Sequence, residues 1–421
     1  MATYSIKAEK MVFGGDCIGK IEGKTVFIPF AIPGETLEVE ITKDLRDYSI
    51  AKIASIQEPS PYRVLPFCQY YGTCGGCNMQ HIQTDYQSKL RAEILKEAFE
   101  REGVATPDIQ IVTGPAQQYR SRFQFHDGGL MARQSNEIIP IASCPCAAPE
   151  INAFLTEIPY EERPKGRTHI FASNKITSIP KGYDKIVIAQ EEAARQKKEK
   201  KLPEITAGGR KLKKQKKIRP RFEGTTVNPQ NLCTVCLNEK NITFDVQGFF
   251  QSNMTVLEQA IPLVTEGLHG KNVLDMYAGA GTFSVFLAES FEHICLVEHN
   301  KNAIVYAEQN LATTGKPGCT HESYGLSGDV WVTYHAANHV QRHGEFDAVV
   351  IDPPRSGMEK SVCQWLCASD IPLIRSLSCD IATHARDAKF LTRAGYHMEK
   401  LFLLDFYPQT CHIESLAWFS K

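Results

Sequence analysis

The chain has 421 residues, of which 43% are hydrophobic and 23% are charged, and its formal net charge is −1. This composition is typical of a soluble globular protein, and the length predicts two to four domains at roughly 100–200 residues each. No apolar run reaches the ~18 residues of a membrane-spanning helix, and the net charge excludes an overall polyelectrolyte-binding character but not a local basic patch.

The first 59 residues predict a small β domain. Short apolar runs such as KTVFIPF and TLEVEIT alternate with turn signals, and no stretch has helical periodicity. About five short strands in such a segment predict a small barrel, because closure removes exposed strand edges. The opening MATYSIKAEK lacks the apolar core of a secretory signal, so we expect a cytoplasmic protein.

The chain contains 14 cysteines, and in a reducing compartment we do not expect them to form disulfides. Cys68, Cys74 and Cys77 lie within ten residues of one another and can converge on one metal centre. Cys144 or Cys146 could supply a fourth ligand. Zinc and an iron–sulfur cluster are both compatible with four thiolates, and the spacing does not separate them.

Residues 84–102 predict an amphipathic helix with Leu90, Ile94, Leu95 and Ala98 on one face. The following residues up to 190 predict a mixed region that is mostly β.

A basic segment spans residues 190–221, with 13 Lys and Arg against 4 Glu, a local net charge of +9. It predicts a solvated insertion that could also contact phosphates nonspecifically. Cys233 and Cys236 lack a partner pair, so we interpret this CxxC as structural.

From residue 249 onward, strand-like runs alternate with helical segments. The runs NVLDMYAG, HICLVEHN, EFDAVVIDPP and LIRSLSCD are followed by a helix that ends at Gly395. This order predicts a parallel sheet with helices on both faces. Residues 396–420 predict two further strands that form an antiparallel pair.

A glycine-rich turn at Asp275–Phe283 follows the first of these strands and opens a helix. Gly279 and Gly281 allow a ligand to approach the backbone closely, and Glu298 ends the next strand, where a carboxylate can accept hydrogen bonds from ribose hydroxyls. The combination favours S-adenosylmethionine (SAM) over NAD, with a purely structural turn as the alternative.

Three further groups are expected at the carboxyl ends of later strands, where ligands bind in open α/β sheets. Asp352 precedes two prolines, Cys379 ends the next strand, and Arg386 could lower the pKa of that thiol. Near the C-terminus, His412 and Glu414 share one face of an expected strand, and Glu414 could act as a general base.

These residues resemble the RNA 5-methyluridine methyltransferase family over nearly the whole chain. The first domain, with GKTVFIPFAIPGE, is similar to a TRAM RNA-binding domain. The C-x5-C-x2-C pattern with the later SCPCAAP resembles the [4Fe-4S] site of the family. The resemblance implies Cys68, Cys74, Cys77 and Cys144 as cluster ligands, with Cys146 as the alternative to Cys144.

The same resemblance implies SAM contacts at Gln251, Tyr277, Glu298 and Asp352, with Asp329 as a weaker match. It also implies Cys379 as the nucleophile and Glu414 as the base. The family usually has Asn-Pro after the nucleophile, where this chain has Asp380-Ile381. An added carboxylate there could oppose formation of the thiolate.

The implied reaction is methylation of carbon 5 of a uridine through a covalent bond between Cys379 and carbon 6. The uridine must be unpaired or flipped out, and Tyr119, Arg120, Arg122 and Phe123 are candidates for RNA contact or ordinary strand residues.

The leading hypothesis is a 23S ribosomal RNA methyltransferase, and the alternative is the same reaction on transfer RNA. Two other hypotheses fit the residues less well. A radical-SAM methylthiotransferase resembles this chain in its TRAM domain but has the cysteine pattern C-x3-C-x2-C, whereas this chain has C-x5-C-x2-C. A non-catalytic RNA-binding assembly factor would not need Cys379 and Glu414. We expect a multidomain protein: a TRAM barrel at 1–59, a mixed α/β cluster-binding domain at 60–248 and a Rossmann-like methyltransferase domain at 249–421. The helix at 84–102 could pack with the last of these. No membrane contact or obligate protein partner is expected.

Overall fold

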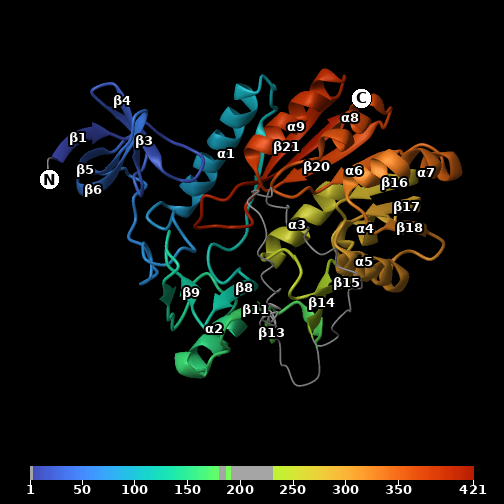
Figure 1. Ribbon diagram of the computed structural model, residues 1–421, viewed down its shortest axis with the longest axis horizontal. Coiled ribbons are helices and arrows are strands. Elements are labelled where there is room, and N and C mark those ends of the chain that lie inside the picture. The colour runs from blue at the N-terminus through green and yellow to red at the C-terminus, as the bar shows by residue number, and fades with distance from the viewer. Residues whose placement is uncertain (1–2, 180–185, 191–230) are drawn as a thin grey trace, which may run out of the picture.

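The computed structural model describes residues 3–179, 186–190 and 231–421, with a small sheet at one end and a large sheet at the other (Figure 1). The small sheet has the order β1-β5-β6-β4-β3-β2, in which β4 and β6 are parallel. Its strands are β1 (Thr3–Lys7), β2 (Lys10–Met11), β3 (Cys17–Ile21), β4 (Lys24–Ile28), β5 (Thr36–Asp44) and β6 (Tyr48–Glu58). The expected small β domain is thus present, but its hydrogen-bonded ladder leaves β1 and β2 as edges and does not close into a barrel.

A long helix, α1 (Thr84–Arg101), matches the expected span and links the small sheet to the rest of the molecule. It buries Leu90, Ile94 and Leu95 and lies against α9 (Ile381–Arg393), as Figure 1 shows. Arg91 on α1 forms a buried ion pair of 2.5 Å with Asp405. The helix therefore packs on the C-terminal part of the protein.

The central part consists of two three-stranded sheets and short elements around them. One sheet contains β8 (Arg122–His126), β11 (Arg167–Ala172) and β13 (Ile186–Gln190), and the other contains β12 (Ile176–Ser178), β14 (Leu232–Leu237) and β15 (Lys240–Asp245). The remaining elements are β9 (Leu130–Met131), β10 (Ile138–Ile139), α2 (Pro149–Glu157) and the 3-10 helix η1 (Tyr160–Glu162).

Cys233 and Cys236 both lie on β14, where Cys233 is buried and Cys236 points to the other face. Three residues apart on a strand, they cannot converge on one centre. Of the basic segment at 190–221, residues 191–221 lie outside the described residues.

The large sheet has eight strands in the order β18-β17-β16-β19-β20-β22-β21-β7. They are β7 (Ile109–Val112), β16 (Gly270–Met276), β17 (Phe291–Val297), β18 (Thr320–Tyr324), β19 (Ala348–Ile351), β20 (Leu373–Ser378), β21 (His397–Leu404) and β22 (Glu414–Ser420). Only β22 runs antiparallel to its neighbours, and it forms the expected antiparallel pair with β21. The edge strand β7 was not expected in this sheet, because it comes from the central part of the sequence.

Helices cover both faces of the large sheet, as expected. Apolar side chains of α3 (Met254–Thr265), α4 (Thr282–Leu287) and α5 (Lys301–Thr314) form one core layer. Those of α1, α6 (Gly328–Tyr334), α7 (Ala336–His343), α8 (Lys360–Ala368) and α9 form the other. Among the described residues, no helix is long and apolar enough to cross a membrane.

The strand order reverses between β16 and β19, because the chain first adds β17 and β18 on one side of β16 and then returns to the other side. Such a switch point opens a crevice at the carboxyl ends of the two strands.

Candidate active site

A cavity of about 710 Å³ lies at this crevice. The expected site residues that line it are Gln251, Tyr277, Glu298, Asp352, Cys379 and Glu414. Asp329 does not: it is exposed on α6, whereas its neighbours Ser327 and Gly328 line the cavity. Residues from six separate segments of the chain therefore meet at one place.

The turn after β16 requires glycine, because its backbone has a positive φ and packs closely against α5. Gly281 has a φ of +75°, and a Cβ at this position would lie 2.9 Å from the Cα of Ala307 on α5. The backbone N–H of Gly279 donates to Glu298 Oε2 at 3.0 Å. Glu298 Oε1 accepts from the N–H of Asn300 at 2.7 Å, so this carboxylate ties the end of β17 to the turn.

Gln251 precedes α3, which is capped by the side chain of Asn253 accepting from Val256 N–H at 3.2 Å. The Oε1 atom of Gln251 is buried and has no hydrogen-bond donor. Buried amide oxygens normally have a partner, and this one belongs to a residue that lines the cavity, so it could accept a hydrogen bond from a bound ligand.

Burial raises the pKa of three carboxyl groups at the site. The pKa is raised to about 6 for Asp275, to about 7 for Asp352 and to about 8 for Glu414. Negative charge on neighbouring carboxylates raises these pKa values as well: Asp275 and Glu298 raise the pKa of Asp352, and Asp352 raises the pKa of Glu414. Clustered carboxyls with raised pKa values are typical of functional sites.

Cys379 follows β20 and lies beside Glu414 and Asp352. Burial and these two carboxyls raise the pKa of its thiol to about 11, and Arg355 opposes the shift. We expected Arg386 to lower this pKa, but the Arg386 guanidinium is bound to Asp387 Oδ1 at 2.6 Å. The relevant cation is Arg355, which the sequence analysis missed although it directly follows the Asp-Pro-Pro segment.

Asp380, the departure from the family pattern, is the N-cap of α9. Its Oδ1 accepts from the backbone N–H groups of Ala382 at 3.1 Å and Thr383 at 2.9 Å. A carboxylate is stabilised at a helix N-terminus. The negative groups that raise the Cys379 pKa are Glu414 and Asp352, so Asp380 serves the helix instead.

A second cavity of about 680 Å³ contains the expected cluster cysteines. Cys68, Cys74, Cys77, Cys144 and Cys146 all line it. The Sγ atoms of Cys77 and Cys146 are 3.8 Å apart, and Cys146 also contacts Cys144.

Arg120 lines both cavities and so lies between them. Its neighbours do not have the exposed position that RNA contact would require: Tyr119 is 5% exposed and Phe123 is 4% exposed. Of the two alternatives left open by the sequence, their burial favours ordinary strand residues over RNA contact. Phe249, which the sequence analysis did not single out, is 67% exposed and lines the first cavity.

Comparison with known families identifies three segments. Residues 3–54 match the TRAM domain, residues 336–421 match "tRNA (Uracil-5-)-methyltransferase", and residues 253–371 match "Conserved hypothetical protein 95".

Curated relatives cover almost the whole chain. A Treponema denticola protein named "Uncharacterized RNA methyltransferase" is 35% identical over 99% of this chain and 98% of its own length. A Shewanella amazonensis protein named "23S rRNA (uracil(1939)-C(5))-methyltransferase RlmD" is 27% identical over 99% of this chain and 95% of its own length.

Among solved structures, the Pyrococcus abyssi tRNA (uracil-54, C5)-methyltransferase in complex with S-adenosyl-L-homocysteine has a TM-score of 0.68. It is 21% identical and covers 99% of this chain and 100% of its own, so the two proteins share a fold. Given the relatives and the matched domains, the chain belongs to the TRAM-containing family of RNA uracil-5 methyltransferases.

Proposed function

We propose that this protein methylates carbon 5 of a uridine in 23S ribosomal RNA with SAM as the methyl donor. The observation that carries the proposal is the shared cavity of Cys379, Glu414 and the glycine turn after β16. The similarity to proteins named 23S rRNA methyltransferases over nearly the full chain supports the choice of RNA.

The residues around the glycine turn fit SAM. Gln251 offers a buried acceptor without a donor, and Glu298 keeps lone pairs beyond its two backbone contacts. Tyr277 donates its hydroxyl hydrogen to Glu359, which fixes the ring at the cavity wall. When bound, SAM supplies an electrophilic methyl group on a cationic sulfur, which suits a site rich in carboxyl groups.

Cys379 and Glu414 would divide the chemistry between them. Carbon 5 of uracil is a weak nucleophile, so the Cys379 thiolate first adds to carbon 6 and the ring gains enolate character. Carbon 5 then takes the methyl group. Glu414 accepts the proton from carbon 5, the bond between sulfur and carbon 6 breaks, and Cys379 leaves as a thiolate.

The target uridine must leave its base stack to reach Cys379. Phe249 stands exposed at the cavity and can stack on a flipped base or its neighbour. The loop before β3 is also close to the site, since Asn78 Nδ2 donates to the carbonyl of Gly14 at 3.1 Å and Asn78 Oδ1 accepts from Cys411 N–H at 2.8 Å. The TRAM sheet can therefore hold RNA that enters the active site.

For the cysteine cavity, we propose a [4Fe-4S] cluster held by Cys68, Cys74, Cys77 and Cys144. The donor set suits either zinc or a cluster. The resemblance of the C-x5-C-x2-C pattern and the later SCPCAAP to the cluster site of the family favours the iron–sulfur cluster.

The test is transfer of labelled methyl groups from SAM to total RNA from a strain that lacks this protein, followed by mapping of the modified base. We expect label at carbon 5 of a uridine in 23S RNA. Label in transfer RNA would contradict the choice of 23S RNA as substrate but would still support methylation of uridine at carbon 5. Absence of any RNA methylation by the cluster-containing protein would contradict the proposal and favour a non-catalytic RNA-binding role.

A further inference from the structure

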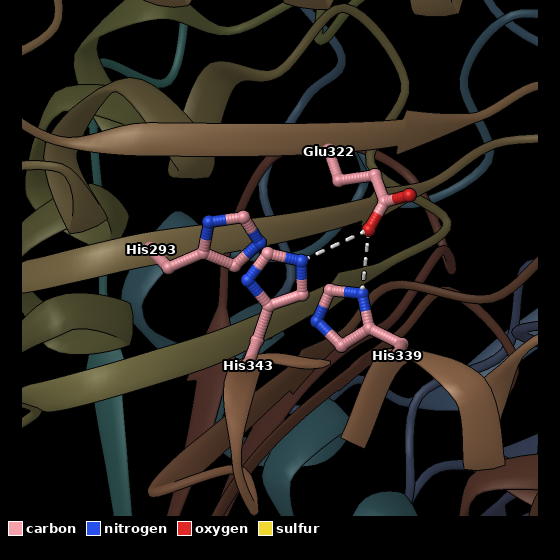
Figure 2. A group of neighbouring side chains, drawn as sticks. All are labelled: His293, Glu322, His339 and His343. Atoms are coloured by element: carbon pink, nitrogen blue, oxygen red, sulfur yellow. Dashed lines mark hydrogen bonds and ion pairs between the residues drawn. The ribbon is translucent and has the colours of Figure 1, made fainter. Parts of the chain in front are cut away.

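A group of three histidines and one glutamate lies on the large sheet away from both cavities. His293 comes from β17, Glu322 from β18, and His339 and His343 from one face of α7. One ligating atom of each residue lies within 4.8 Å of the ligating atoms of the other three. Figure 2 shows the carboxylate of Glu322 facing the three imidazole rings.

This group is separate from the active site. His293 lies near the start of β17, whereas Glu298 follows the other end of the same strand. None of the four residues lines the cavity at the switch point. Methyl transfer therefore does not explain why the four side chains converge.

The hydrogen bonds around His293 leave a lone pair on its Nε2 atom. His293 Nδ1 lies 2.7 Å from the hydroxyl of Thr320, and that hydroxyl donates to the carbonyl of Glu292 at 3.3 Å. Because the hydroxyl hydrogen is used there, the oxygen accepts from His293 Nδ1–H, which leaves a lone pair on Nε2. His293 is 7% exposed, and its Nε2 has no partner.

His339 repeats this feature, since it is fully buried and its Nε2 also lacks a partner. Neutral imidazole is the form that binds metal ions.

The carboxylate is also held in position. Arg342 donates to Glu322 Oε1 at 2.9 Å. The other oxygen, Oε2, lies 3.1 Å from His339 Nδ1 and 3.3 Å from His343 Nε2. Outer partners of this kind, such as Arg342 and Thr320, orient ligands in metal sites.

We propose that His293, Glu322, His339 and His343 bind one divalent transition-metal ion. Three imidazoles and one carboxylate make a four-ligand set that suits zinc, whereas calcium and magnesium prefer oxygen ligands throughout. The ion joins two strands at one edge of the sheet to α7, and α7 directly follows α6, whose first residue, Gly328, lines the cavity proposed for SAM. Its role is therefore to fasten this edge, and no step of methyl transfer uses it.

The test compares zinc binding by the cluster-containing protein and by variants, using metal analysis and calorimetric titration. We expect one zinc per chain beyond the metal of the cysteine site. His343→Asn, at the most exposed of the four positions, and Glu322→Gln should lose this zinc or bind it at least about 10–100-fold more weakly, the loss that removal of even an outer partner causes. His321→Asn is the matched control, because His321 is an exposed histidine on β18 next to Glu322. This variant should bind zinc as the wild type does.

Thr320→Val is a second variant, which keeps every ligand and removes only the acceptor for His293 Nδ1–H. It should weaken zinc binding by about 10–100-fold with the fold intact by circular dichroism. With cobalt in place of zinc, the site should give visible absorption without the thiolate charge-transfer bands of a cysteine site. A wild-type protein that binds no metal beyond the cysteine site, or equal zinc affinity in the wild type, His343→Asn and Glu322→Gln, would overturn the proposal.

Discussion

Glu414 shows how burial sets the protonation of the site. Its pKa of about 8 means that the carboxyl is mostly protonated in the free protein at neutral pH. Asp352, with a pKa of about 7, is protonated in about half of the molecules at that pH. A cationic ligand beside them would lower both pKa values and favour the charged forms. The proposed base would thus become competent when SAM occupies the cavity.

This protonation predicts a pH-dependent effect of Glu414→Gln on the stability of the free protein. The pKa is raised from 4.5 unfolded to about 8 folded, so the stability that the neutral carboxyl provides is fully present below pH 4.5 and is lost as the pH rises through 8. Glutamine cannot ionise. The melting temperature of the variant should therefore exceed that of the wild type by an amount that grows as the pH rises from 5 to 9.

Thermal denaturation of the ligand-free protein at several pH values measures this difference. Glu9→Gln, at an exposed glutamate, is the control and should show no such trend. A difference between Glu414→Gln and wild type that does not change with pH would mean that the Glu414 pKa is not raised.

A second prediction concerns the fourth ligand of the cysteine cavity. Cys144→Ser should abolish the brown colour and the iron and sulfide content of anaerobically purified protein, whereas Cys146→Ser should retain them. Iron and sulfide analysis of both variants is the measurement. The reverse pattern would assign the ligand to Cys146, and a colourless wild type containing zinc would replace the cluster by a zinc ion.

At the scale of elements, the loop of residues 405–413 between β21 and β22 connects the parts of the molecule. Asp405 pairs with Arg91 of α1, and the carbonyl of Gln409 accepts from the N–H groups of Asn78 and Met79. The hydroxyl of Tyr119 donates to the carbonyl of Pro408 at 2.9 Å. The loop leads directly into Glu414, so these contacts set the position of the proposed base.

The buried pair of Arg91 and Asp405 therefore predicts a large effect on stability. Their side chains are 1% and 2% exposed, so Asp405→Ala leaves an unpaired buried guanidinium and should lower the free energy of unfolding by about 3–5 kcal/mol. Urea denaturation checks this value. Glu100→Ala, which breaks the exposed pair with Lys96 on the same helix, should cost at most about 1 kcal/mol. Equal shifts for both variants would contradict the account.

At the scale of the whole molecule, much of the fold and of the site could be predicted because the signals are local. The strand–helix alternation predicts the parallel sheet, and parallel strands bring Glu298, Asp352 and Cys379 to one edge whatever the details of packing. The helix at α1 was predicted nearly to its ends from its periodicity.

The remainder depends on contacts between distant segments, which leave no local pattern. The pairing of β7 with β21 is of this kind. The group of His293, Glu322, His339 and His343 comes from three elements, and only His339 and His343 share a local spacing, four residues apart on α7. Tyr119 and Phe123 are compatible in sequence with RNA contact or with an ordinary strand, and their burial in the structure favours the strand.

The central claim is that Cys379 acts before methyl transfer and Glu414 acts after it. The most direct measurement is denaturing electrophoresis of Glu414→Gln incubated with RNA and labelled SAM, with Cys379→Ala and the double variant as controls. We expect Glu414→Gln to accumulate as a covalent RNA complex that carries the label, and neither variant lacking Cys379 to form a complex or to methylate RNA. Normal turnover by Glu414→Gln would assign the base to another group, first of all His412, and carbon 5 methylation by Cys379→Ala would contradict the covalent mechanism itself.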